Sequence, residues 1–304
     1  MREPTVSVVV AEQLRKRYGE TVAVDGVSLA VERGEVFGII GPNGSGKTTT
    51  VECLQGLRRP DGGELRVLGL DPLRQGVELR RRIGCQLQES ALPERIRVWE
   101  ALDLFASLAA ESRDPRELLR EWGLEDKRDA SFHGLSGGQR QRLFVALALV
   151  TRPEVVFLDE MTTGLDPAAR RVAWGLIEEI REGGATVVLV THFMEEAERL
   201  CDRIAVFAQG RIVATGTPAE IAAAAGGGTR LTFSAAEREL AWLRDLPHVE
   251  SAERRDGRVE VVGTGPVLPL VAAALVRRGI VPDDLRVEQP TLEDAFLRLT
   301  GGEE

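Results

Sequence analysis

One stretch of the chain has the residue types and spacing of a phosphate-binding loop: Gly41, Pro42, Asn43, Gly44, Ser45, Gly46, Lys47, Thr48 and Thr49. It fits the pattern G-x-x-x-x-G-K-[ST]. Glycines allow a tight turn in which several backbone N–H groups point at one anion. Lys47 supplies a positive charge for the β and γ phosphates, and Thr48 offers a hydroxyl to Mg²⁺. The loop therefore predicts the binding of a nucleoside triphosphate with magnesium.

A pair of acidic residues follows an apolar run later in the chain. Val155–Leu158 is continuously apolar, as expected of a central parallel strand, and Asp159 and Glu160 stand at its carboxyl end. In open α/β sheets, ligands bind at that end of the strands. Asp159 is suited to be a Mg²⁺ ligand, and Glu160 is suited to orient or deprotonate a water molecule.

A second glycine-rich helix start is formed by Leu135, Ser136, Gly137, Gly138 and Gln139. Ser136 is placed to cap the helix that follows, and such a helix start can bind a phosphate group. One nucleotide does not easily need both glycine-rich segments from one chain. The sequence therefore implies a second subunit.

The elements that must position these residues alternate between strands and helices. Expected strands lie at 5–10, 22–31, 35–40, 64–67 (an edge strand), 155–158 and 185–190, and expected helices include 98–110, 168–181 and 194–200. A hairpin is expected over residues 203–215. The alternation predicts a mainly parallel sheet covered on both faces, with a mostly helical insertion at about 88–150.

The Ala/Gly tract at 222–228 is the best candidate for a linker between two domains. Beyond it we expect strands at 230–233, 259–262 and 285–288, a hairpin around Asp256-Gly257, and helices at 235–243, 267–278 and 292–299. The predicted domains are therefore residues 1–222 and a small α+β domain at 229–304.

Composition limits the classes of function. The net charge of −9 argues against a nucleic-acid surface, because such domains are usually basic. No apolar run approaches the roughly 20 residues that cross a bilayer, and the first residues lack the apolar core of a signal peptide. The cysteines (Cys53, Cys85 and Cys201) lack metal-ligand spacing, which favours reduced thiols in a cytoplasmic protein.

Over about residues 5 to 222 the chain strongly resembles the ATP-binding subunit of an ABC transporter. The resemblance depends on motifs in a fixed order: Walker A at Gly41–Thr49, a Q-loop at Gln88, the signature at Leu135–Gln139, Walker B at Val155–Asp159 with Glu160, a D-loop at 164–166, and a switch histidine at His192. It implies an α/β fold, the P-loop NTPase ABC ATPase domain, with a mainly parallel sheet, an antiparallel β subdomain and a helical subdomain, plus the small C-terminal α+β domain.

The resemblance also implies roles for single residues. Tyr18 would stack on adenine, although a half-buried strand tyrosine is the alternative, and Gln88 would reach Mg²⁺ and the attacking water. Ser136 and Gly138, together with Gly137, Gln139 and Asp166, would face the ATP of a partner subunit. Glu160 would be the general base, and His192 would hold the γ-phosphate and the water. Met161 stands where the family commonly has Pro, which we expect to alter loop stiffness and not chemistry.

The C-terminal segment 289–301 resembles the end of ATPases from ABC-2 type exporters, including the daunorubicin-resistance-like, multidrug group, as do residues 191–198 and 201–204. This implies an ATPase at the cytoplasmic face of the membrane, working as a homodimer or as a heterodimer with a similar ATPase. It would drive a separate membrane permease that exports a drug, lipid or other compound. The alternatives are an ABC importer ATPase, a non-transport ABC ATPase acting as a mechanical switch, and a module that binds ATP without hydrolysing it.

Overall fold

A six-stranded sheet forms the centre of the first of two compact units, residues 1–218 and 219–304. The computed structural model describes residues 6–86, 91–109, 111–224, 228–235, 241–255 and 257–301. The sheet order is β5-β6-β7-β3-β8-β9, parallel except for β9. Its strands are β3 (Val36–Ile40), β5 (Ile83–Gln86), β6 (Val155–Asp159), β7 (Thr186–Thr191), β8 (Arg203–Ala208) and β9 (Arg211–Gly216).

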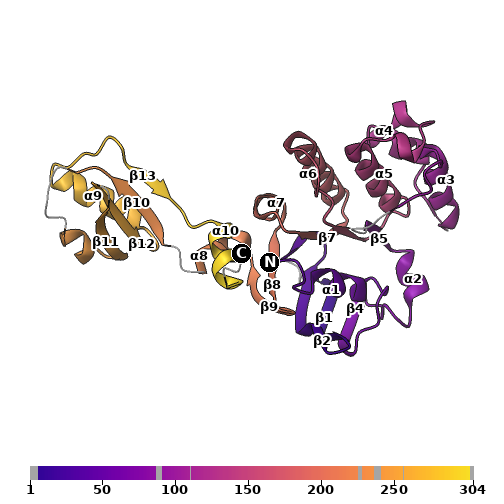
Figure 1. The fold of residues 1–304 in the computed structure, drawn as a ribbon, viewed down its shortest axis with the longest axis horizontal. Helices are drawn as coiled ribbons and strands as arrows, with labels where there is room; N and C mark the ends of the chain where they lie inside the picture. The colour runs from indigo at the N-terminus through magenta and orange to yellow at the C-terminus, as the bar shows by residue number, and fades with distance from the viewer. Residues whose placement is uncertain are drawn as a thin grey trace. The chain divides into compact units, whose positions relative to one another are not determined.

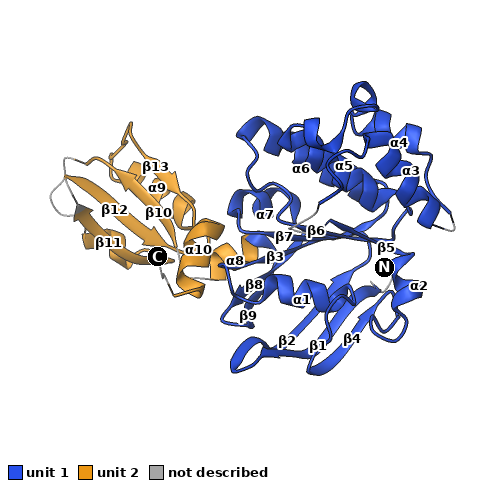
Figure 2. Ribbon diagram, turned by 45° about the vertical axis from the view of Figure 1, so that its right-hand side comes forward, with its two compact units in different colours: residues 1–218 blue, residues 219–304 orange. Residues whose placement is uncertain are grey.

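Every residue of β3, β6 and β7 is buried, because the sheet is covered on both faces. On one side lies helix α1 (Lys47–Leu54) with an antiparallel sheet of order β2-β1-β4 (Figure 2). The strands of that sheet are β1 (Ser7–Tyr18), β2 (Thr21–Glu32) and β4 (Gly62–Val67). Side chains of α1 and both sheets form one core cluster. The predicted edge strand at 64–67 is confirmed.

Helices cover the other side of the six-stranded sheet (Figures 1 and 2). They are α3 (Val98–Leu108), α4 (Pro115–Glu121), α5 (Gly137–Leu149), α6 (Pro167–Glu182) and α7 (Met194–Leu200). The short helix α2 (Gly76–Arg80) precedes β5. None of the helices in the described part of the chain is long and apolar enough to cross a membrane.

The second unit is an antiparallel sheet of order β11-β12-β10-β13 with helix α9 (Val267–Arg277) against β10. Its strands are β10 (Thr229–Phe233), β11 (Val249–Arg255), β12 (Arg258–Gly263) and β13 (Arg286–Glu288). Strand side chains that include Leu231 and Phe233 form its own core with Val271 and Leu275 of α9. Helix α10 (Leu292–Leu299) ends the unit. The predicted α+β class is confirmed for this part of the chain.

Two local expectations in this region were wrong in part. Residues 222–224 of the expected linker end a helix, α8 (Pro218–Ala224), because alanine is the best helix former. Residues 225–227 lie outside the described residues. Of the helix expected at 235–243, residues 236–240 also lie outside them, and 241–243 belong to a 3₁₀-helix, Ala241–Asp245.

Candidate functional site

The phosphate loop connects β3 to α1, which is the predicted strand–loop–helix setting; both elements are labelled in Figure 2. Gly46 precedes α1 with a φ of 98°. A Cβ atom on Gly46 would lie 2.3 Å from the carbonyl oxygen of Ala23, so no larger residue fits there without movement. A Cβ atom on Gly41 would lie 2.6 Å from the hydroxyl of Ser45. The glycines thus allow the loop to turn closely against β2.

The polar side chains of this loop are buried. Lys47 is 5% exposed, and its Nζ donates hydrogen bonds to the carbonyl oxygens of Gly41 at 2.8 Å and Pro42 at 2.9 Å. Burial lowers the pKa of Lys47, while the nearby carboxylates of Glu160 and Asp159 raise it. The Ser45 hydroxyl is buried and has no hydrogen-bond partner among the residues that the structure describes. An anion in the loop would give both groups a favourable partner.

Asp159 ends β6 and is 3% exposed. Burial first, and then the adjacent charge of Glu160, raise the pKa of Asp159 to about 6. The hydroxyl of Thr48, on α1, hydrogen-bonds to this carboxylate. The Oδ1 atom of Asp159 is buried without a partner in the described part of the chain. The structure therefore brings together Asp159 and Thr48, which the sequence predicted as ligands of one cation.

This donor set fits Mg²⁺. A hard cation takes carboxylate and hydroxyl oxygens, and it would satisfy the unpaired oxygen of Asp159. Within the described residues, no three His, Cys, Asp or Glu side chains come together as a metal site. A magnesium ion here would therefore depend on phosphate and water oxygens in addition to Asp159 and Thr48, as is usual for sites that bind Mg²⁺ with a nucleotide.

Glu160 and His192 meet at the ends of the neighbouring strands β6 and β7. Oε1 of Glu160 lies 3.4 Å from Nδ1 of His192, and the two side chains are 10% and 38% exposed. Glu160 has a φ of 49°, a conformation that is uncommon for a residue with a side chain and that turns the chain at the end of β6. Its backbone N–H donates to the carbonyl oxygen of Val190 at 3.0 Å. The strand pairing thus fixes both predicted catalytic residues.

The second glycine-rich segment opens α5. The Ser136 hydroxyl accepts a hydrogen bond from the backbone N–H of Gln139 at 3.3 Å, and Gln139 Oε1 accepts one from the backbone N–H of Ser136 at 2.9 Å. The predicted cap is therefore present. Asp166 caps α6 in the same way, accepting from the N–H groups of Ala168 and Ala169 at 2.9 Å.

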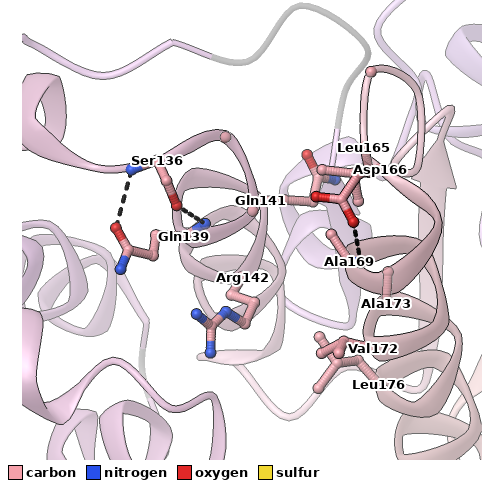
Figure 3. A pocket seen from close by; sticks show the side chains of 13 residues that line it. Ser136, Gln139, Gln141, Arg142, Leu165, Asp166, Ala169, Val172, Ala173 and Leu176 are labelled. Atoms are coloured by element: carbon pink, nitrogen blue, oxygen red, sulfur yellow. Dashed lines mark hydrogen bonds between the residues drawn. The ribbon is translucent and has the colours of Figure 1, made fainter.

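A cleft of about 430 Å³ separates these two helix starts (Figure 3). Ser136, Gln139 and Arg142 stand on the α5 side, and Asp166, Ala169 and Val172 stand on the α6 side. Among the described residues that line this cleft, none belongs to the phosphate loop. The signature and D-loop residues therefore share one surface, separate from the loop of their own chain.

Two predicted site residues remain, Tyr18 and Gln88. Tyr18 ends β1, pairs with Thr21 and is 41% exposed; Ala23, two residues beyond Thr21, is the residue against which Gly46 packs. The guanidinium of Arg58 lies 5.2 Å from the Tyr18 ring centroid. The Tyr18 side chain is thus partly exposed with a cationic group beside its ring, and adenine stacking stays a prediction. Gln88 lies outside the described residues.

A second cleft has a volume of about 460 Å³. Gln86 and Ala91, the described residues on either side of 87–90, both line it. Its wall is largely apolar and includes Leu57, Leu92, Phe105, Phe144 and Leu147. Gln55, which also lines it, is 1% exposed, and neither polar atom of its side chain has a hydrogen-bond partner among the described residues. Leu57 is 55% exposed and Phe105 is 37% exposed.

Sequence reasoning missed a buried cluster behind the Glu160–His192 pair, centred on Glu196. Glu196 lies on the buried face of α7 with Ala197 and Leu200. The sequence did hold one signal: a carboxylate stands at a position where the helical spacing predicts an apolar, buried residue.

Comparison with known proteins agrees with this arrangement. A model of the ABC transporter family matches residues 24–163. The daunorubicin resistance ATP-binding protein DrrA3 of Streptomyces coeruleorubidus is 39% identical over 306 residues, which cover 97% of this chain and 96% of that protein. The Nod factor export ATP-binding protein I of Ralstonia nicotianae is 40% identical over 97% of this chain and 94% of that protein.

Solved structures give the same result for the fold. The structure of an ATP-binding subunit of an ABC transporter matches with a TM-score of 0.65 and 30% identity, covering 71% of this chain and 92% of that one. A dimeric bacterial ABC transporter cassette matches with a TM-score of 0.62 and 27% identity, covering 69% and 98%. The predicted fold and family are thereby confirmed: the chain belongs to the ATP-binding proteins of the ABC transporter family and is an ABC transporter ATPase.

Proposed function

We propose that this ATPase drives the export of a compound through a separate membrane permease, working on the cytoplasmic face of the membrane. The observation that carries the proposal is the length of the similarity. Relatives named for daunorubicin resistance and for Nod factor export match 96–97% of the chain, and thus the C-terminal unit as well as the ATPase unit. The similarity is thus not confined to residues 24–163, which the ABC transporter family model matches.

In the proposed reaction, Glu160 accepts a proton from the attacking water, and His192 holds that water and the γ-phosphate. The 3.4 Å separation between their side chains supports this pairing. Lys47 leaves the two loop carbonyls and binds the β and γ phosphates. Ser45 contributes a hydroxyl that has no partner within the described part of the chain.

Magnesium would be held by Asp159 and Thr48, with Gln88 reaching toward it. When bound, the ion would neutralise charge on the phosphate oxygens. The unpaired Oδ1 atom of Asp159 supports this assignment. The residues of this chain supply the oxygen ligands and the base, and β6 and β7 keep them in place.

We propose that two copies close head-to-tail over two ATP molecules, each completed by Ser136–Gln139 and Asp166 of the other copy. A heterodimer with a similar ATPase would use the same surfaces. The separation of the α5–α6 cleft from the phosphate loop supports this arrangement, as does the similarity to a cassette described as dimeric. The second, apolar cleft, lined by Leu57 and Phe105, is the proposed docking site of the permease, because these exposed side chains suit a partner segment.

The catalytic part of the proposal is tested with Glu160→Gln. Loss of the base should lower kcat about 10²- to 10⁴-fold, and the variant should collect as an ATP-bound dimer in size-exclusion chromatography. Robust steady-state hydrolysis by this variant would overturn the assignment of the base. Glu195→Gln, an exposed position on α7, is the control and should behave like the parent chain.

The direction of transport is tested in inverted membrane vesicles from cells that express the chain together with a candidate permease. ATP-dependent accumulation of a labelled anthracycline or lipid inside the vesicles, absent with Glu160→Gln, is expected for an exporter. ATP-driven release of preloaded compound from the same vesicles is the result expected of an importer and would refute the proposal.

A further inference from the structure

The carboxylate of Glu196 binds three segments that are distant in sequence. Its Oε2 accepts a hydrogen bond from Oγ1 of Thr162 at 3.3 Å, and its Oε1 accepts one from Nε1 of Trp174 at 3.0 Å. The hydroxyl of Thr191 is a third hydrogen-bond partner. Glu196 is 1% exposed. Burial raises the pKa of this carboxyl, and the three hydrogen bonds and the charge of Arg170 oppose the rise.

Each of these segments carries a residue of the ATPase site. Thr162 lies two residues after Glu160, and Thr191 immediately precedes His192. Trp174 lies on α6, which begins beside Asp166. The chain around the general base, the switch histidine and the D-loop therefore meets at a single buried carboxylate.

Arg170 and Phe193 extend this cluster to the histidine. The guanidinium carbon of Arg170 lies 3.9 Å from the centroid of the Phe193 ring. That ring lies 4.1 Å from the imidazole of His192, between centroids. The backbone N–H of Phe193 donates to the Thr191 hydroxyl at 3.0 Å. Because Arg170 is on the second turn of α6, a shift of this helix would change the position of His192 through the ring of Phe193.

We propose that Glu196 is a positioning residue for ATP hydrolysis. It keeps Glu160 and His192 in their mutual geometry and couples them to α6 and the D-loop. This inference rests on the proposed roles of Glu160 and His192. A carboxylate with three donors from three segments fixes their relative positions more narrowly than an apolar side chain of similar size, because hydrogen bonds are directional.

The test is Glu196→Gln. An amide oxygen can still accept from the indole of Trp174, and the amide nitrogen can donate to Thr162, so the variant keeps the shape of the cluster and loses its charge. We expect kcat to fall about 10- to 100-fold, since small displacements at a reacting centre have effects of this size. We expect the KM for ATP to change by less than about threefold, because the phosphate loop is untouched. Glu195→Gln again serves as the control on the same helix.

Trp174→Phe gives an independent test, because it removes the indole N–H and keeps a ring in place. It should also lower kcat. In the double variant with Glu196→Gln, the fold-decrease in kcat should be smaller than the product of the two single fold-decreases. A fluorescent ATP analogue measures binding, and thermal melting measures the folded fraction.

Two results would overturn the inference. One is a fall in kcat that merely follows the loss of folded protein. The other is independent, multiplicative effects of the two variants. Failure of the proposed function is distinguishable: it would appear as retained hydrolysis in Glu160→Gln, whatever Glu196→Gln does.

Discussion

Asp159 and Glu160 place two carboxylates side by side at the end of a buried strand. Such an arrangement costs free energy in the protein alone, since Asp159 is 3% exposed and its Oδ1 atom has no partner among the described residues. The raised pKa of Asp159, caused by burial and by Glu160, records the same cost. Residues whose burial costs free energy are concentrated at functional sites, where a bound ligand offsets that cost.

Asp159→Asn should therefore raise the thermal midpoint of the first unit while abolishing Mg²⁺-dependent hydrolysis of ATP. A gain of about 1 kcal/mol corresponds to roughly 2–4 °C in a unit of this size. Differential scanning calorimetry and phosphate release measure the two effects. Asp61→Asn is the matched control, because the pKa of Asp61 is shifted in the opposite direction. The Arg17 N–H and the Lys16 ammonium lower the pKa of Asp61, so its loss should not stabilise. A lower midpoint for Asp159→Asn would contradict the argument.

Gly44 and Gly46 allow a sharper test of the loop, because both have positive φ but only one is crowded. Gly44 has a φ of 78° and nothing within 4 Å of an added Cβ, whereas Gly46 would place that atom 2.3 Å from the Ala23 carbonyl oxygen. Gly44→Ala should carry only the backbone strain of about 1–2 kcal/mol. Gly46→Ala should lower the thermal midpoint further, since β2 must also move. Equal losses would show that the contact with Ala23 is relieved without cost.

At the scale of elements, α5 and α10 begin with the same cap chemistry in different surroundings. Ser136 caps α5 at the α5–α6 cleft, and Thr291 caps α10 in the second unit, accepting from the N–H of Asp294 at 3.1 Å. Each hydroxyl closes a reciprocal pair of hydrogen bonds with the residue three positions later. Comparing substitutions at the two caps therefore distinguishes the contribution of a cap to stability from the proposed role of Ser136 toward ATP.

Ser136→Ala and Thr291→Ala should each cost about 1 kcal/mol of stability. In the Glu160→Gln background, only Ser136→Ala should also weaken ATP-dependent dimerisation, because Ser136 is proposed to face the partner's nucleotide. Analytical ultracentrifugation with and without ATP measures the dimer. Equal weakening by Thr291→Ala would show that the effect comes from general destabilisation.

The elements were more predictable than the site. Val155–Leu158 has a continuous apolar pattern and is the buried β6; Ser136 has the residue type of a cap, and the cap is present. Local pattern was sufficient in both cases. Glu196 was missed because its partners Thr162 and Trp174 are 34 and 22 positions away. Such contacts depend on how β6, α6 and α7 pack, which no local spacing specifies. The roles of Tyr18 and Gln88 stay predictions.

At the scale of the whole molecule, the chain consists of two units with separate cores. The first is built around both sheets and α1, and the second around its own antiparallel sheet and α9. Separate cores predict separate unfolding transitions. Asp284 offers a way to assign the transition of the second unit. It accepts hydrogen bonds from the backbone N–H and the hydroxyl of Ser234, both at 2.8 Å, and pairs with Arg258 at 2.9 Å.

These contacts, with the Ser234 N–H first among them, lower the pKa of Asp284 below its ordinary value of 3.8. The folded unit then binds this proton more weakly than the unfolded chain. The ionised carboxylate therefore stabilises the unit above that ordinary value, and the stabilisation is lost as pH falls through the lower folded pKa. Calorimetry from about pH 5 to about pH 2 tests this. As pH falls over that range, the midpoint temperature of the second unit's transition should decrease less steeply in Asp284→Asn than in the parent chain.

Asp283→Asn, at the exposed neighbouring position, is the control and should follow the parent chain. The transition of the first unit should be the same in all three proteins, because its acid-sensitive pairs, such as Asp25 with Arg211, are unchanged. Identical acid dependence of Asp284→Asn and the parent would mean that the Ser234–Asp284–Arg258 contacts do not stabilise the second unit. A shift of both transitions by Asp284→Asn would mean that the two units unfold together.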